Sequence, residues 1–533
     1  MSYFQIVTPP IINEINESDY TSYYVDPVKG DDNNTGISEG APVKTLDKVA
    51  GLTKGVKTKL LLKSGATFTG TLTLSNLQSD DKKPLIVDIY GGNERAIIDG
   101  NGADNAVAIR SGNVRFRNIK ITNKSGKRGI FVTPETAGAF SNIEISGCLF
   151  EEINWAGYCE LPDSPADIDV EAICPNSKYN YNYGGIIFEA NTPDSIGASW
   201  FENIYITDNE LRCVAKTGIW LNTSWCKRPG LPWGNNEYIN DDNGWFPSKN
   251  VIVRNNFISH VGGDAIVLIA TRNSFLDHNT VYHANYLGRQ GYFCGGIWPH
   301  SSIDFTTQFN EVAYTHLEHG AGDGEGLDVD IGCINTVVQF NYVHHNDGGA
   351  ILICNNRSDL GIGDHRGTVI RNNVFYANGQ PERGVFTISS SVGKTDIYNN
   401  TIIVTPQSSA LLVLSADWAK TGNSSEFTFR NNIFAATSPI LSIFTLSFID
   451  ECHFENNLFW QVDSQPANDK HPHLFDPKIT IPLIFDGYIQ GLKFNALEPK
   501  VFSEGILFDG MSESDFAGNP AKGIKYIGAF ANK

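Results

Sequence analysis

Two aspartates, Asp328 and Asp330, lie two residues apart in the segment Gly326-Leu327-Asp328-Val329-Asp330. In an extended strand this spacing puts both side chains on one face, roughly 6.5–7 Å apart. That separation overlaps the gap of roughly 6.5–9.5 Å between the two carboxyl groups of inverting glycosidases. A carboxyl with a raised pKa can protonate a leaving group while its ionised partner acts as base or nucleophile. The pair is therefore a candidate for acid–base chemistry.

Similar short segments precede and follow this pair, and each can be aligned by the residue at its head. If their apolar residues point inward, two tryptophans and three carboxylates share one outward face, where tryptophan can stack on sugar rings. The aligned segments start at Gly218, Asp264, Gly296, Gly326 and Gly349. The outward set is Trp220, Asn222, Asp264, Trp298, His300, Asp328 and Asp330. We expect Asp328 and Asp330 to be the principal catalytic carboxylates, with Asp264 and Glu325 as alternates.

The remaining polar residues of this face are expected to bind substrate, and some have a second interpretation. The expected substrate-binding residues are Trp220, Asn222, Trp298, His300, His319, Asp347 and Arg357. The acidic residues Asp323, Glu325, Asp328 and Asp330 are alternatively a Ca²⁺ site, because hard cations prefer carboxylate oxygens. Asp264 alternatively caps a turn, and Trp220 and Trp298 alternatively pack beneath a loop.

These segments belong to a repeat that runs through most of the chain. An asparagine follows a short strand pattern at positions 256, 279, 310, 341, 373, 400, 432 and 457, so the steps are 23–32 residues. Each unit contains two or three runs that alternate apolar with polar residues, which indicates strands and not helices. One such coil cannot bury its own apolar face, so coils must stack. Asparagine suits the turns because it tolerates left-handed backbone and its amides can hydrogen-bond along the stack.

The repeat predicts an all-β fold, a right-handed parallel β-helix with long loop insertions, since parallel crossovers are overwhelmingly right-handed. We expect an N-terminal capping segment with the first coil at 1–100, the β-helix at 101–460 and a C-terminal capping segment at 461–533, forming one structural domain. Residues 151–183 and 223–248 interrupt the repeat. They carry several tryptophans, and we expect them to wall the substrate groove and favour action on short chains or chain ends.

Several motifs resemble those of known enzymes. Tyr23-Tyr24-Val25-Asp26-Pro27 with Ala41-Pro42-Val43-Lys44-Thr45-Leu46, and then Ile97-Ile98-Asp99-Gly100, are similar to the start of secreted bacterial β-helix carbohydrate-active enzymes of the pectate-lyase-like superfamily. Asp515-Phe516-Ala517-Gly518-Asn519-Pro520 resembles their C-terminal segment. The resemblance implies the architecture and a carbohydrate substrate. It does not specify a reaction, because that superfamily contains lyases and hydrolases.

The acidic outward face favours a glycoside hydrolase nearest the β-helix glycosidases of that superfamily. The alternatives are a polysaccharide lyase that eliminates from a uronate glycan with Ca²⁺, and a non-catalytic glycan-binding solenoid. Lysine is absent from 250 to 393, which disfavours the lyase, although the arginines at 272, 289, 357, 366 and 383 keep it open. A hydrolase of this kind requires no cofactor.

The charge and the apolar content of the chain exclude some classes of binding partner. With 40 basic and 59 acidic residues the net charge is −19, which argues against nucleic acid, and the sequence has no apolar run long enough to span a membrane. We expect an extracytoplasmic location, although no signal peptide is present in this chain. Nine cysteines leave at least one unpaired. Cys159 with Cys174 and Cys213 with Cys226 are candidate loop disulfides, and buried free thiols are the alternative.

Overall fold

A computed structural model describes residues 8–531 except 158, 160–165, 167, 175–181, 229–243, 289–291, 356–363, 441–442, 464, 467, 481–494 and 497. Contacts within the chain define two compact units. The N-terminal unit contains residues 10–228 and 244–272, and the C-terminal unit contains residues 8–9 and 273–531. This division differs from the three segments expected from the sequence.

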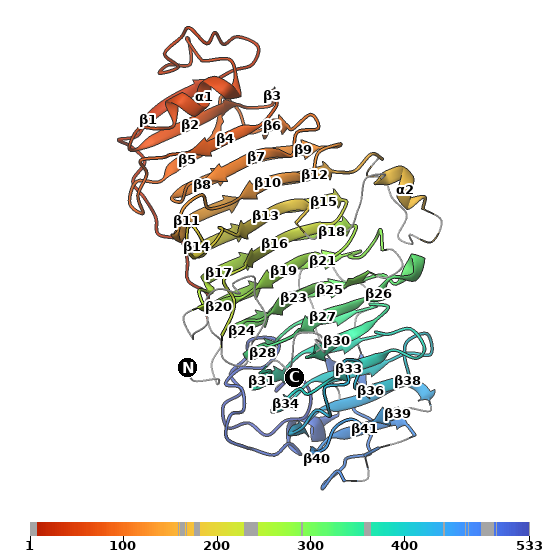
Figure 1. Cartoon of the computed structure of the whole chain (residues 1–533). Helices are drawn as coiled ribbons and strands as arrows, with labels where there is room; N and C mark the ends of the chain where they lie inside the picture. The colour runs from red at the N-terminus through yellow and green to blue at the C-terminus, as the bar shows by residue number, and fades with distance from the viewer. Residues whose placement is uncertain are drawn as a thin grey trace. The chain divides into compact units, whose positions relative to one another are not determined.

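The N-terminal unit is built from parallel strands in three sheets, which the chain visits in turn (Figure 1). Its first sheet contains β1 (Thr21–Val25), β2 (Thr58–Lys63), β5 (Leu85–Tyr90), β8 (Val114–Arg117), β11 (Gly138–Ser146), β14 (Ser199–Thr207) and β17 (Ser248–Arg254). The second contains β3 (Thr67–Thr69), β6 (Ala96–Asp99), β9 (Ile119–Asn123), β12 (Leu149–Ile153), β15 (Glu210–Val214) and β18 (Phe257–Val261). The third contains β4 (Leu72–Ser75), β7 (Asn105–Arg110), β10 (Arg128–Val132), β13 (Gly184–Ala190), β16 (Thr217–Thr223) and β19 (Ile266–Ile269).

The C-terminal unit repeats this arrangement, and β20 (Thr271–Asp277) crosses the border between the units. Its first sheet contains β24 (Ile303–Gln308), β28 (Ile334–Gln339), β31 (Thr368–Arg371), β34 (Thr395–Tyr398), β37 (Phe427–Arg430) and β40 (Cys452–Glu455). The second contains β21 (Thr280–Tyr282), β25 (Glu311–Ala313), β29 (Tyr342–His344), β32 (Val374–Tyr376), β35 (Thr401–Val404), β38 (Ile433–Ile440) and β41 (Leu458–Val462). The third contains β23 (Ile297–His300), β27 (Glu325–Val329), β30 (Gly349–Cys354), β33 (Gly384–Ser389), β36 (Leu411–Ala416) and β39 (Ile443–Thr445).

Short elements complete the described part of the chain. Helix α1 (Leu46–Leu52) is capped by the Thr45 hydroxyl, and α2 (Val170–Ile173) by the Asp169 carboxylate. The others are the paired strands β22 (Phe293–Cys294) with β26 (Gly322–Asp323) and β42 (Ile479–Thr480) with β43 (Asn495–Ala496), and the 3-10 helices Glu318–Gly320 and Pro499–Phe502. Among the described residues no helix combines the length and apolar character of a membrane span. The three sheets of parallel strands, which the chain visits in turn, confirm the predicted parallel β-helix.

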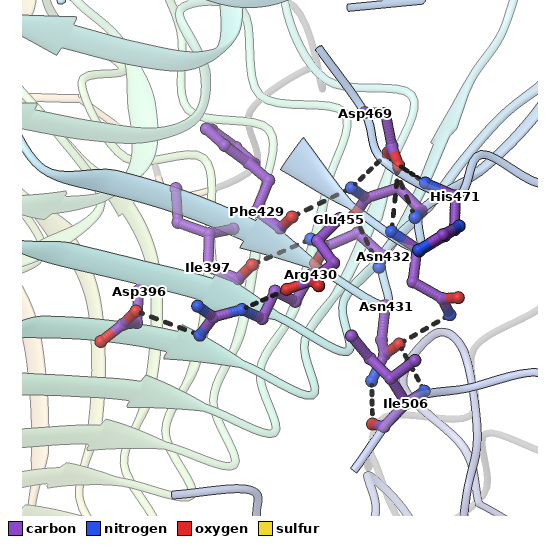
Figure 2. A network of polar contacts seen from close by, with 12 residues as sticks. Asp396, Ile397, Phe429, Arg430, Asn431, Asn432, Glu455, Asp469, His471 and Ile506 are labelled. Atoms are coloured by element: carbon purple, nitrogen blue, oxygen red, sulfur yellow. Dashed lines mark hydrogen bonds and ion pairs between the residues drawn. The ribbon is translucent and has the colours of Figure 1, made fainter. Parts of the chain in front are cut away.

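The repeated asparagines form a buried hydrogen-bonded ladder, as their spacing predicts. In the C-terminal unit the side-chain amide of Asn310 donates to Oδ1 of Asn341, and Asn341 donates likewise to Asn373, each at 2.9–3.0 Å. The series continues to Asn457, which donates to Oδ2 of Asp469, and Figure 2 shows this last part of the ladder. Because every buried amide finds a partner in the next coil, the turn costs little in lost hydrogen bonds.

The left-handed backbone of this turn falls on the residue before the ladder asparagine. Asn372, Asn399 and Asn431 have φ of 53°, 54° and 51°, whereas their neighbours Asn373, Asn400 and Asn432 supply the ladder amides. Phenylalanine holds the same left-handed position at Phe309 and Phe340. The two roles expected of one asparagine are thus divided between consecutive residues.

One disulfide is present among the described residues of the N-terminal unit, and it joins Cys159 to Cys213. Neither predicted pair, Cys159 with Cys174 or Cys213 with Cys226, is formed. Cys159 follows β12, and Cys213 lies in β15, which is the neighbour of β12 in the second sheet. Residues one coil apart are brought together instead, and these two cysteines are 54 positions apart.

Candidate active site

Trp298, His300, Asp328 and Asp330 come from adjacent strands of the third sheet of the C-terminal unit. Ile297 in β23 pairs with Leu327 in β27, which pairs with Ile351 in β30, and all three side chains are buried. Strand side chains alternate between faces, so Trp298 and Asp328 project from the opposite face, followed by His300 and Asp330. The register therefore puts these four residues on the outward face, where the sequence placed them.

Asp328 and Asp330 form a cluster with Cys354, which lies at the end of β30. One carboxylate oxygen from each aspartate and the Cys354 sulfur all lie within 4.8 Å of one another. The thiol donates to Asp330 Oδ1 at 3.1 Å, and the backbone N–H of Ile331 donates to the same oxygen at 2.7 Å. Burial raises the pKa of Cys354 well above its usual value, and the negative charges of Asp330 and Asp328 raise it further. Cys354 is therefore a protonated donor at neutral pH.

Two histidines adjoin this cluster. His300 Nε2 lies 3.9 Å from Asp330 Oδ2, and both side chains are 15% exposed. The other ring nitrogen of His300 is 2.6 Å from the Ser301 hydroxyl. His365 is buried, which lowers its pKa to about 4, so it is neutral and its Nδ1–H donates to the Cys354 carbonyl at 2.9 Å. The site thus offers two carboxylates at the surface and a layer of buried donors behind them.

The nearest oxygens of the two carboxylates are closer than the spacing that the strand rise gives to the residues themselves. The strand rise fixes Cα positions, but the reacting atoms are at the ends of side chains that can lean toward each other. Asp330 follows Val329, the last residue of β27, and its backbone N–H still donates to the Pro299 carbonyl of β23 at 3.2 Å. With the side chains leaning together, oxygens of the two residues approach within 4.8 Å.

Neither of the alternate catalytic carboxylates, Asp264 and Glu325, lies on the outward face. Ile219 pairs with Ile266 and not with Ala265, so the predicted alignment is wrong by one residue. Asp264 is therefore fully buried, with Oδ2 at 3.9 Å from Lys216 Nζ. Glu325 is 1% exposed and shares the strand face of Leu327, and burial raises its pKa well above the usual range.

The predicted Ca²⁺ set is not assembled. Among the described residues the donor group around Asp328 and Asp330 is completed by Cys354, and not by Asp323 or Glu325. A protonated thiol is a poor ligand for a hard cation, whose preferred donors are oxygens. The residues present therefore do not fit Ca²⁺.

Asp347 belongs to a second cluster, with His316 and Glu318, at the turns between the second and third sheets of the C-terminal unit. Single ligand atoms of these three side chains lie within 4.8 Å of one another. Hydrogen bonding to His316 lowers the pKa of Glu318, whereas burial and then the charge of Glu318 raise the pKa of Asp347. His319 lies in the 3-10 helix beside this cluster, but its side chain is outside the described part of the structure, as is all of Arg357.

Trp220 and Asn222 share a partner that sequence reasoning missed. In the N-terminal unit, the indole N–H of Trp220 donates to Glu189 Oε1 at 2.6 Å, and the Asn222 amide is 3.4 Å from Oε2. Glu189 lies on β13 directly opposite Asn222, and burial raises its pKa. The sequence does contain a signal for Glu189. The segment Gly184-Gly185-Ile186-Ile187-Phe188-Glu189 begins with glycine and alternates in the same way as the aligned strands.

The tryptophans themselves are more buried than expected. Trp220 is 7% and Trp298 9% exposed, so little of either side chain is accessible to solvent. Trp155 and Trp225, from the two insertions expected to wall the groove, are fully packed at 0% and 2%. Trp233 lies outside the described residues. Those two insertion tryptophans are therefore packing residues of the N-terminal unit.

Comparison with known proteins finds a relative that aligns with nearly the whole chain. The chain is 25% identical to a lacto-N-biosidase of Bifidobacterium longum subsp. longum over an alignment of 601 positions. That alignment covers 96% of this chain but 36% of the relative, so the chain spans about a third of the relative's length. No family model matches the sequence.

Solved structures show the same fold. A GH136 lacto-N-biosidase from Eubacterium ramulus superposes in its native form with a TM-score of 0.60 and 18% identity, covering 85% of this chain and 68% of that one. Its selenomethionine form gives 0.59 at 20% identity, with 76% and 67% covered. A complex of XylC with xylose gives 0.51 at 13% identity, with 96% and 98% covered.

Proposed function

We propose that this chain is a glycoside hydrolase that acts on an oligosaccharide through Asp328 and Asp330. The observation that carries the proposal is the close pair of carboxylates on the outward face of the third sheet. The similarity to a lacto-N-biosidase over 96% of this chain supports the same reaction class. Hydrolysis by two carboxylates requires no cofactor.

The surroundings of the two carboxylates suggest different roles. Asp330 has one oxygen held by two donors, from Cys354 and Ile331, and this fixes its position as a nucleophile. Asp328 is then the general acid and base. Oxygens within 4.8 Å suit the separation of roughly 5–5.5 Å in retaining enzymes better than the longer inverting gap.

The proposed reaction has two steps. Asp330 attacks the anomeric carbon as the glycosidic C–O bond breaks, and Asp328 gives its proton to the leaving oxygen. Asp328 then removes a proton from water, which attacks the anomeric carbon of the glycosyl ester and releases Asp330 as a carboxylate. The product keeps the configuration of the substrate.

For the substrate we propose a lacto-N-bioside, because the curated relative is a lacto-N-biosidase. We further propose that the protein works outside the cytoplasm, since the Cys159–Cys213 disulfide is typical of oxidising compartments.

The experiment is hydrolysis of a p-nitrophenyl lacto-N-bioside by the wild type and by Asp323→Asn, Asp328→Asn and Asp330→Asn, with Asp463→Asn as an exposed control. We expect loss of at least about a hundredfold at Asp328 and Asp330, the usual contribution of acid–base catalysis. NMR of the first product should show retention of configuration.

Other outcomes would change the assignment. If Asp328→Asn stays active while Asp323→Asn does not, the acid–base role belongs to Asp323. If both Asp328→Asn and Asp330→Asn stay active, the proposed site is wrong. Unsaturated products from a uronate polymer would identify a lyase, and binding without turnover on a broad glycan panel would identify a non-catalytic protein.

A further inference from the structure

Trp418 alone is exposed among the tryptophans that the structure describes, at 45%. It follows β36, a strand of the third sheet of the C-terminal unit, by two residues. Asp330 follows β27 of the same sheet, and β27, β30, β33 and β36 are neighbours in that order (Figure 1). Because parallel strands end at the same edge of a sheet, Trp418 lies at the edge that carries the proposed nucleophile.

The separation between Trp418 and the catalytic pair follows from two contacts. Cys354, whose thiol donates to Asp330, is paired with Ser389 of β33. The backbone N–H of Trp418 donates to the Ser389 hydroxyl at 3.2 Å, so the turn after β36 folds back over the end of β33. Neighbouring strands are about 4.8 Å apart, and two such steps put the backbone of Trp418 roughly 10 Å from Asp330. The indole is therefore too far away to contact the sugar ring that Asp330 would attack.

A series of hydrogen bonds joins the turn after the catalytic strand to the turn that carries the tryptophan. Gly332, in the first turn, donates its backbone N–H to Oδ1 of Asn355 at 3.3 Å. The Asn355 amide donates to the Ser391 carbonyl at 3.3 Å, and the Ser391 hydroxyl donates to the carbonyl of Thr421, in the second turn, at 2.8 Å. The two turns therefore belong to one hydrogen-bonded framework.

The turn that carries Trp418 is fixed by groups other than the indole. The Asp417 carboxylate accepts from the backbone N–H groups of Thr421 at 3.0 Å and Gly422 at 3.2 Å. The Ser390 hydroxyl accepts from the backbone N–H of Ala419 at 3.1 Å. None of these bonds uses the ring of the tryptophan, so the indole is not needed to shape the turn. It is presented on an ordered backbone, which leaves little ordering to be done when a ligand binds.

A second exposed aromatic side chain, Phe448, lies one coil further along the same edge. It follows β39, the neighbour of β36, and is 40% exposed. Its backbone N–H donates to the Ser415 hydroxyl of β36 at 3.2 Å, which holds it beside the end of that strand. Two exposed aromatic residues thus follow one another in the direction that leads away from Asp330.

We propose that the Trp418 indole is a stacking platform for a sugar ring on the leaving-group side of the substrate, beyond the ring that the cleaved bond joins. This inference rests on the proposed hydrolysis and specifies a substrate longer than the disaccharide that is released. The flat indole can cover the apolar face of a pyranose while the sugar hydroxyls stay in water. The leaving-group side is the part of open length, since the released part ends at its second ring.

The position of Trp418 also determines which kinetic constant it affects. A ring that is remote from the cleaved bond is stacked equally in the ground state and in the transition state. Such uniform binding lowers KM and leaves kcat unchanged.

The test compares two substrates with the full chain. One is p-nitrophenyl lacto-N-bioside, and the other is the tetrasaccharide in which the same disaccharide is joined to lactose. Trp418→Ala should lower the ratio of kcat/KM for the tetrasaccharide to kcat/KM for the p-nitrophenyl substrate by about tenfold, through a higher KM for the tetrasaccharide. Trp418→Leu, which keeps apolar bulk without a flat ring, should lose as much, and Trp418→Phe should lose less. Phe257→Ala removes a ring of 40% exposure from the second sheet of the N-terminal unit and should keep the wild-type ratio.

Three results would overturn this inference and leave the proposed hydrolysis intact. They are an unchanged ratio in Trp418→Ala and Trp418→Leu, a loss in kcat at unchanged KM, and a larger loss in Phe448→Ala than in Trp418→Ala. If the alanine variant does not fold, the leucine variant decides in its place. If the wild type cleaves neither substrate, the proposed function is wrong, and the stacking platform is wrong with it.

Discussion

Replacing Glu311 by glutamine is expected to raise the melting temperature of the protein at alkaline pH and leave it unchanged at acidic pH. Glu311 lies on β25 in the C-terminal unit and is fully buried. Its Oε1 accepts from the Tyr282 hydroxyl at 2.7 Å and lies 3.2 Å from His344 Nε2. Burial lowers the pKa of His344 to about 3, so this histidine brings no positive charge at neutral pH.

The magnitude follows from the pKa of Glu311, which burial raises from 4.5 to about 8. Below pH 4.5 the carboxyl is protonated in both states and costs nothing. Between pH 4.5 and 8 the unfolded chain loses this proton while the folded protein keeps it, so stability falls as pH rises. The loss is roughly 3 kcal/mol at pH 7 and roughly 5 kcal/mol above pH 8.

Glutamine has the shape of the protonated acid and does not titrate, so the variant escapes this loss. The assay is the melting temperature of the wild type and of Glu311→Gln from pH 5 to 9, with Glu451→Gln as an exposed control. We expect equal values near pH 5 and a difference of up to roughly 5 °C at pH 9. A variant that is equally or less stable at pH 9 would show that Glu311 is ionised at little cost in the folded protein.

Three further predictions concern the site and the fold. Cys354→Ala should lower kcat/KM by about tenfold because Asp330 loses a hydrogen-bond donor, while Cys354→Ser keeps a donor and most of the rate; equal losses would mean that the thiol acts only by packing. Asn341→Ala removes several buried hydrogen bonds of the ladder and should lower the free energy of unfolding by roughly 2–4 kcal/mol; a change below about 1 kcal/mol would contradict the importance of the ladder. Treatment with EDTA should leave hydrolysis unchanged, and a loss that Ca²⁺ restores would establish a metal requirement.

Periodicity in the sequence was sufficient to predict the fold. The asparagines at 310, 341 and 373 recur once per coil, so their stacking into a ladder needs no knowledge of distant contacts. The outward direction of Trp298 and Asp328 also follows from local alternation along a strand. In contrast, the position of Asp264 required the register between β16 and β19, which is set by pairing of Ile219 with Ile266.

The sequence by itself determined the coils, the sheet face that carries Asp328 and Asp330, and the acidic character of that face, because all three depend on the repeat and on strand alternation. Only the tertiary structure decided which side chains meet across coils. Cys354 reaches Asp330 from the next coil, Glu189 reaches Trp220, and Cys159 pairs with Cys213. The physical reason is that stacking brings residues together at separations of 24 to 54 positions, and the loops between coils vary in length, so no fixed spacing in the sequence encodes these partners.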